Sequence, residues 1–164
     1  MKRKFILPAA ALLTVLILLF SFRPGTEDEV SFYYPRKEFL YGTADGVISS
    51  EVRDMIGHTD DLAYLIRMFL LTPTSDHLVS PFPQGTRLVS CEYTSNSIAI
   101  TLSENGGPMS DIRFTLACAC LAQTCRSIQP AEYVTIVRGS QSMTLPSSGV
   151  LLEADNSYFN GGNK

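Results

Sequence analysis

The chain has 164 residues, of which 45% are hydrophobic and 18% are charged, enough for one domain and an anchor but too few for two full domains. Nine of the 13 basic residues follow position 23, together with all 16 acidic residues, so the chain beyond that point has a formal charge of −7. An acidic surface repels phosphate backbones, and nucleic acid is therefore not expected as a partner.

The first predicted element is the uncharged apolar run over residues 5–22. Eighteen helical residues span ~27 Å, close to the ~30 Å of a bilayer's hydrocarbon core. The basic stretch at residues 2–4 should stay cytoplasmic, which places the rest of the chain outside the membrane. Residues 1–23 are therefore a membrane anchor or a signal peptide. The spacing of small residues suits a cleavage site poorly, which favours a single-pass anchor over a cleaved, secreted form.

Residues 24–29 form a short acidic linker. Residues 30–34 are rich in β-branched and aromatic side chains and predict a strand that Pro35 ends. Residues 43–46 predict a turn, because Asp and Gly accept the backbone angles of tight turns. Residues 47–56 predict a second strand.

A first helix follows, with Thr59 as its expected cap and the acidic Asp60 and Asp61 in its first turn. Its apolar residues recur at helical spacing and form one stripe, which consists of Leu62, Leu65, Ile66, Phe69 and Leu70. Pro73 is expected to end the helix.

Residues 81–107 predict a β-hairpin, because two alternating runs flank the polar turn at residues 94–96. One covered face is expected to carry Val89, Cys91 and Tyr93. The second strand contributes Ile98, Ile100 and Leu102. Each strand then buries only one face, so helices must cover that face.

A second helix is expected over residues 110–127, with Ser110 as cap and Asp111 in its first turn. Residues 133–138 predict a strand, Gly139 and Ser140 a turn, and residues 141–145 a returning strand. Residues 146–164 read as a flexible polar tail. The order of elements predicts an α+β fold, a small, mainly antiparallel sheet covered by two helices behind an N-terminal transmembrane helix.

The stretch "RMFLLTPTSDHLVSPFPQGTRLVSCEYTSNSIAITLSEN" resembles the GerMN domain of sporulation and spore germination lipoproteins. The matching positions are a helix stop, an approach to a strand and a strand end: Leu70-Leu71-Thr72-Pro73, then Leu78, Pro83, Gly85 and Thr86, then Thr101-Leu102-Ser103. Glu51 and Arg53 lie near the place of the family's Glu-x-Arg strand. Thr72 stands where the family prefers glycine, and the lipid-bearing cysteine is missing.

The resemblance covers residues 30–145 and implies a domain whose fold is similar to ring-building motifs. It implies a cell-envelope protein of a spore-forming type of Gram-positive bacterium. It also implies other envelope proteins, or further copies of the chain, as partners. Attachment would have to use the apolar segment itself.

Four cysteines are the first candidates for chemistry: Cys91, Cys118, Cys120 and Cys125. Cys118 and Cys125 share one helical face, while Cys120 points nearly opposite to Cys118. Thiols that diverge in this way suit neither a zinc site nor a redox pair. We expect small core residues, with a disulfide from Cys91 to a helix cysteine as the alternative and metal or redox chemistry as the third reading.

Other candidate sites have ordinary structural readings. His58 and His77 have acidic neighbours, which suit a general base or a metal pair, but both lie beside helix ends or in a loop. The stretch "GSQSM" from Gly139 lacks the second glycine of a nucleophile elbow. The stretch "ENGGPM" at residues 104–109 lacks the lysine of a phosphate-binding loop.

Aromatic residues on the surface are the remaining binding feature. The candidates are Tyr33, Tyr64 and Phe82, together with Phe39, Leu40 and Tyr41 in a loop. Aromatic side chains are enriched at interfaces, but these residues could instead cover the second face of the sheet.

The sequence therefore predicts a non-enzymatic extracytoplasmic module that acts by protein–protein contact in the cell envelope, with no catalytic, cofactor-binding or metal-binding residues. A module that binds peptidoglycan through residues 39–41 is the alternative, and a thiol-dependent enzyme is the third reading. The resemblance implies a sporulation or germination assembly.

Overall fold

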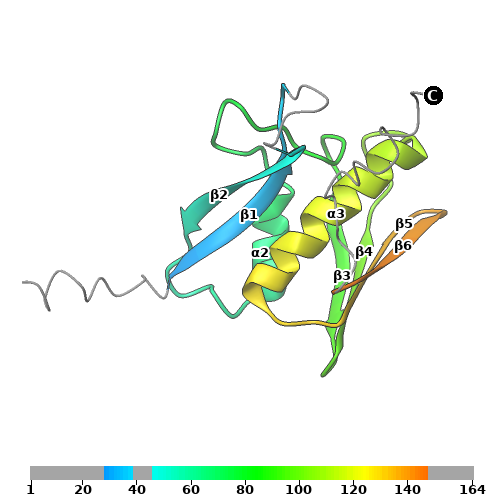
Figure 1. Cartoon of the computed structure of the whole chain (residues 1–164). Coiled ribbons are helices and arrows are strands. Elements are labelled where there is room, and N and C mark those ends of the chain that lie inside the picture. The colour runs from blue at the N-terminus through cyan, green and yellow to red at the C-terminus, as the bar shows by residue number, and fades with distance from the viewer. Residues whose placement is uncertain (1–27, 39–45, 148–164) are drawn as a thin grey trace, which may run out of the picture.

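The computed structural model describes residues 28–38 and 46–147. Strands β1 (Glu29–Pro35) and β2 (Ile48–Asp54) pair antiparallel as a separate two-stranded sheet (Figure 1). Both strands were predicted, and Pro35 ends the first. The expected turn at residues 43–46 falls mostly outside the described residues. Within it, Gly46 has a φ of 63°, which glycine adopts without strain.

Helix α2 (Leu62–Phe69) begins later than the sequence indicated. Its cap is Asp61, whose side chain accepts a hydrogen bond from the backbone N–H of Tyr64. Thr59 is therefore not the cap, and the acidic residues precede the first turn instead of lying in it. Asp accepts this bond as well as Thr does, so the first cap-forming residue in the sequence was not decisive.

Strands β3 (Leu88–Tyr93) and β4 (Ser97–Leu102) form the predicted hairpin, but with an irregular register. Leu88 pairs with Leu102 while Ser90 pairs with Thr101, so Val89 is an extra residue in the first strand. A bulge of this kind turns a side chain away from the regular alternation. Val89 is 65% exposed, and the expectation that it shares the covered face with Cys91 was wrong.

Helix α3 (Asp111–Ile128) starts at the predicted cap, Ser110, and joins β4 to β5 (Tyr133–Arg138). Strand β6 (Gln141–Pro146) returns beside β5 as expected. The sheet order is β3-β4-β5-β6, and β4 and β5 are parallel. A helix of this length carries the chain back along the sheet, so the next strand runs in the same direction.

The structure confirms an α+β fold with two helices among the described residues, but it divides the strands between two sheets. Helix α3 lies between the β1–β2 hairpin and the four-stranded sheet, and helix α2 lies on the same side of that sheet (Figure 1). Residues 117–122 of α3 are buried on every side. Alanine and cysteine suit this position, because thin side chains let elements approach from both sides.

Helix α3 also covers the free edge of β1. The backbone N–H of Tyr33 donates to the Thr124 hydroxyl at 2.9 Å, and the Ser127 hydroxyl donates to the Ser31 carbonyl at 2.8 Å. These side chains pair with backbone groups of β1 that face away from β2. The β1–β2 hairpin is thereby attached to the core through its edge as well as its inner face.

Candidate interaction surface

The helix cysteines lie in the core. Cys118, Cys120 and Cys125 have no exposed surface, although Cys118 and Cys120 point to different sides of α3. All four cysteines are free thiols in the structure. Burial raises the pKa of Cys118 to about 12 and raises that of Cys120 and Cys125 further still. A thiol that resists ionisation in this way is a poor nucleophile.

Cys91 on β3 is the most accessible of the four thiols. It is half-buried at the edge of the sheet, and burial raises its pKa as well. Residues of the hairpin's inner face surround it, since it pairs with the buried Ile100.

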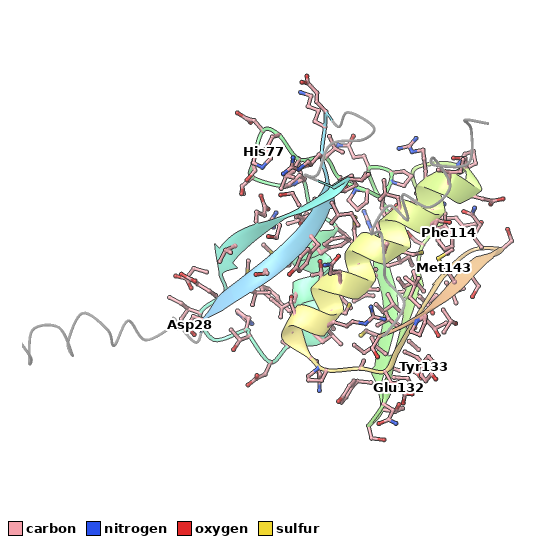
Figure 2. All side chains as sticks on the ribbon, viewed as in Figure 1. Asp28, His77, Phe114, Glu132, Tyr133 and Met143 are labelled. Carbon is pink, nitrogen blue, oxygen red and sulfur yellow. The ribbon has the colours of Figure 1, made fainter. Side chains whose placement is uncertain are left out.

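The two histidines lie in different parts of the molecule and have different neighbours. The His58 ring stacks on Tyr64 with centroids 4.0 Å apart, and His77 is exposed, with its carbonyl accepting a hydrogen bond from the N–H of Lys37. In Figure 2, His77 lies far from Tyr133 on β5. Within residues 28–38 and 46–147, no three His, Cys, Asp or Glu side chains form a group that could hold a metal ion.

Glu51 and Arg53 form a buried ion pair on the inner face of β2. Arg53 donates to Glu51 through Nε at 2.6 Å. Glu51 also accepts from the backbone N–H groups of Thr74 and Ser75 and from the Thr74 hydroxyl. Burial alone would raise the pKa of Glu51, but these hydrogen bonds outweigh it and lower the pKa to about 2.

The same ion pair closes the end of helix α2. Arg53 donates to the Met68 carbonyl at 3.2 Å and to the Tyr34 hydroxyl at 3.1 Å, and Tyr34 donates to the Phe69 carbonyl at 3.1 Å. Tyr34 also stacks on Phe69. Side chains from the neighbouring hairpin thus satisfy the last carbonyls of the helix, which compensates for the absence of a terminating glycine at Thr72.

This network was not predicted from the sequence, although both charges were expected on one strand. Residues two apart on a strand share a face, so Glu51 and Arg53 had to point the same way as each other. Two opposite charges on one face of a strand, next to a strand rich in aromatic residues, were the signal from which a buried ion pair could have been predicted. The network joins β2 to the end of α2 and to the backbone of Thr74 and Ser75.

The glycine-rich loop at residues 104–109 is held by Arg138, which is 2% exposed at the end of β5. Its Nη2 donates to three loop carbonyls, those of Glu104, Asn105 and Gly107. Gly106 has a φ of 92°, and a Cβ there would lie 2.5 Å from the Gln84 carbonyl oxygen. The loop's carbonyls therefore face a cation from the chain itself, and Gly139 belongs to the β5–β6 turn as predicted.

The aromatic candidates divide into three groups. Phe82 is 3% exposed, so the expectation that it lies on the surface was wrong; it packs edge-to-face against Phe69. Tyr33 and Tyr64 are half-buried. The loop residues 39–41 lie outside the described residues.

The four-stranded sheet has one face covered by helices and one face without an element over it among the described residues (Figure 1). On β4 the covered side carries Ile98, Ile100 and Leu102, so Ala99 and Thr101 point the other way. By the register of the pairs, Ser97, Tyr133, Thr135 and Val137 of the central strands lie on this uncovered side together with Ala99 and Thr101. The edge strands add Ser90, Glu92, Ser142, Thr144 and Pro146. We call these eleven residues the open face.

Small and uncharged side chains make up the open face. Glu92 is the only ionisable carboxylate on it, and it lies on the edge strand β3. The Thr135 and Thr144 hydroxyls hydrogen-bond each other across β5 and β6 at 2.9 Å. Tyr133, 44% exposed, is its one aromatic residue. Apart from Glu92, covering this face desolvates no charged group.

Two depressions lie on the surface of the described residues, and the first borders the open face, since Asn96 and Glu132 line it. One of about 480 Å³ is lined by residues that include Arg126, Glu132 and Ser147. The other, of about 540 Å³, is lined by the carboxylates Asp28, Asp60 and Asp61. Arg126 already donates to the Leu145 carbonyl at 2.8 Å, and Asp61 caps α2, so both depressions use side chains that serve the fold.

The predicted anchor lies outside the described residues. Within residues 28–38 and 46–147 there is no helix with the length and apolar character needed to cross a bilayer.

Known proteins share the structure of this chain more clearly than its sequence. No protein-family model matches it, and no curated protein matches it. A solved structure described as "Putative Lipoprotein from Clostridium perfringens" is similar at 17% identity and a TM-score of 0.46, over 73% of this chain and 87% of that one. The tandem GerMN domains of the sporulation protein GerM from Bacillus subtilis are similar at 13% identity and a TM-score of 0.48, over 69% of this chain and 39% of that one. GerMN domains, which the stretch at residues 70–103 resembles, are thus among the solved structures to which this chain is similar.

Proposed function

We propose that this chain is a non-enzymatic, membrane-anchored module whose domain lies outside the cytoplasmic membrane and acts by protein–protein contact. The contact surface is the open face of the four-stranded sheet. The resemblance of residues 70–103 to GerMN domains supports a role in the cell envelope, in a sporulation or germination assembly.

The anchoring part of the proposal is supported by the sequence. Residues 5–22 carry no charge, and a basic stretch precedes them. An apolar run of this length beside lysine and arginine favours insertion with the following domain outside. The domain is then confined close to the membrane surface, because only residues 24–29 separate it from the run.

The observation that carries the contact function is the contrast between the two sides of the hairpin β3–β4. Its inner side is packed against α2 and α3 with Ile98 and Ile100 fully buried or nearly so. Its outer side carries the small, uncharged residues of the open face. The fold therefore fixes this surface rigidly and presents it, which lowers the entropic cost of binding.

The placement of the reactive groups supports a non-enzymatic role. The helix thiols lie in the core with raised pKa values, and Glu51 and Arg53 are engaged with the end of α2. Groups held in this way stabilise the domain and do not face a common point on the surface.

The proposal is tested by site-specific photo-crosslinking in intact cells with the anchor kept. A photoreactive residue replaces Ala99 on the open face or, as the matched control, Ser50, an exposed residue on β2. We expect protein adducts from position 99 and few from position 50, in cells that are growing and in cells that are sporulating. Mass spectrometry of the adducts identifies the partner.

Two outcomes would contradict the proposal. Adducts that contain only lipid or glycan at position 99 would exclude a protein contact, and sedimentation of the purified chain with peptidoglycan would then support the wall-binding alternative. Equal protein adducts from both positions would show that the open face is not selective.

A further inference from the structure

We propose that the open face binds a second copy of this chain, with strand β5 of each copy lying over strand β4 of the other. The inference rests on the proposed function, because it names the partner of the same surface. It follows from the shape of the face, its charge and its area.

The open face is self-complementary in shape. Strand β5 carries the larger residue in two rows across the central strands, Tyr133 beside Ser97 and Thr135 beside Ala99, and in the third row Val137 is close in size to Thr101. Strand β5 is thus a ridge and β4 a trough. A twofold axis that runs along the strands turns the ridge of one copy onto the trough of the other.

The parallel pairing of β4 and β5 makes this match work in both rows. Because the two strands run in the same direction and start at Ser97 and Tyr133, the axis keeps their rows aligned. Tyr133 of one copy then lies over Ser97 of the other, and Thr135 lies over Ala99. A large residue over a small one lets two sheets pack at ~10 Å without voids.

The low charge of the open face makes it better suited to a symmetric contact than the acidic faces of the molecule. A symmetric contact brings a patch against itself, so a charged patch meets its own sign. The chain beyond position 23 has a formal charge of −7. The open face carries one carboxylate, Glu92, and the axis places it over the Thr144 hydroxyl of the other copy, because these residues end the same row.

The area of the face sets the strength of the contact. Four strands of six residues form a surface of about 19 by 20 Å, or ~400 Å² per copy. A standard stable interface buries about 800 Å² per partner. The contact is therefore weak in free solution and gains from the confinement of both copies to one membrane surface.

Sedimentation equilibrium of the full chain in detergent micelles, at about 0.15 M salt, tests the inference. The wild-type chain should show a concentration-dependent dimer. Ala99→Lys should weaken it at least about tenfold, because the lysine fills the trough that Thr135 of the other copy occupies and loses the hydration of its charge in the contact. Within one copy this lysine pairs with Glu92 across β3, so the domain should stay folded.

The matched control and the orientation test use exposed residues of the edge strands. Ser142→Glu on β6 should weaken the dimer, whereas Ser50→Glu on β2 should not. Thr144→Lys should hold the dimer better than Thr144→Glu, because it faces Glu92 of the other copy. Circular dichroism melting of each variant confirms that it is folded.

Each outcome decides between the inference and the proposed function. A wild-type chain that stays monomeric at all concentrations overturns the inference, and adducts of a different protein at position 99 would still support the proposed function. Equal weakening by Ser50→Glu, or a tighter dimer with Thr144→Glu than with Thr144→Lys, also overturns it. A monomeric chain without protein adducts overturns both.

Discussion

Two hairpins of this molecule, β1–β2 and β3–β4, use the same element for opposite purposes. The β1–β2 hairpin is held by the chain on its inner face and along the edge of β1, through Thr124 and Ser127 of α3. The β3–β4 hairpin buries one face under the helices and leaves the other without a covering element among the described residues. The surfaces of the first hairpin stabilise the fold, whereas the second hairpin leaves one surface accessible to a partner.

The difference is also one of chemistry. The inner face of β2 carries an ion pair, Glu51 and Arg53, that joins the hairpin to the end of α2. The outer face of β4 carries Ala99 and Thr101, which have no charge and form no ion pair. Polar groups that are fully satisfied inside the chain fix a fold, and uncharged ones outside it favour a contact.

The largest expected effect is on the β1–β2 hairpin. Glu51→Gln should lower the free energy of unfolding by about 3 kcal/mol, because it leaves the buried Arg53 without its anionic partner. Denaturant unfolding of the full chain in detergent measures this loss. Glu92→Gln on the exposed β3 edge is the matched control and should change the free energy by less than about 0.5 kcal/mol. Equal effects at the two positions would show that the ion pair does not distinguish the hairpins.

Acid should act through the same carboxylate. The pKa of Glu51 is about 2 in the folded chain and 4.5 ordinarily, so the unfolded chain binds the proton first as pH falls. The resulting stabilisation, about 3 kcal/mol, is complete above pH ~5 and is lost as pH falls toward 2.

Unfolding curves of the wild-type chain and Glu51→Gln, recorded between pH 6 and pH 2, isolate this contribution. The difference in unfolding free energy between the two proteins should shrink steadily as pH falls. A difference that stays constant over this range would mean that Glu51 does not have a lowered pKa.

The rates at which the thiols are alkylated distinguish the edge of the β3–β4 hairpin from the interior of the molecule. Under native conditions an alkylating reagent should modify Cys91 first, because part of this side chain is accessible. The reagent should reach the fully buried Cys118, Cys120 and Cys125 only when the core opens. In denaturant all four should react at similar rates. Mass spectrometry of peptides over time gives the order, and rapid native labelling of Cys118 or Cys120 would support a thiol-dependent enzyme instead.

Local patterns in the sequence predicted most elements of this fold. Strong alternation located β1 and β4, and a serine before a helical run located the start of α3 at Ser110. These signals depend on neighbours within a few residues. The cap of α2 was misplaced because Thr59 and Asp61 are both good caps and only tertiary packing chooses between them.

Features that depend on distant residues could not be read in the same way. The parallel pairing of β4 and β5 follows from the path of α3 across the sheet, although a strand, a helix and a strand in succession were visible. The partners of Glu51 are backbone groups of Thr74 and Ser75, which no periodicity reveals. The open face was predicted only as the uncovered side of the hairpin, because its ridge and trough require the register of β5.

The smallest expected effect concerns the bulge that corrected the predicted register of β3. Val89 lies outside the alternation and is 65% exposed, whereas Ile100 on β4 is 1% exposed. Val89→Ala should therefore change the free energy of unfolding by less than about 0.5 kcal/mol, and Ile100→Val should lower it by about 1 kcal/mol. If β3 were a regular strand with Val89 on the covered face, losing two methyl groups there would cost more than losing one from Ile100. Denaturant unfolding of the two variants thus decides whether the bulge exists, because the regular and the bulged strand reverse the order of the two losses.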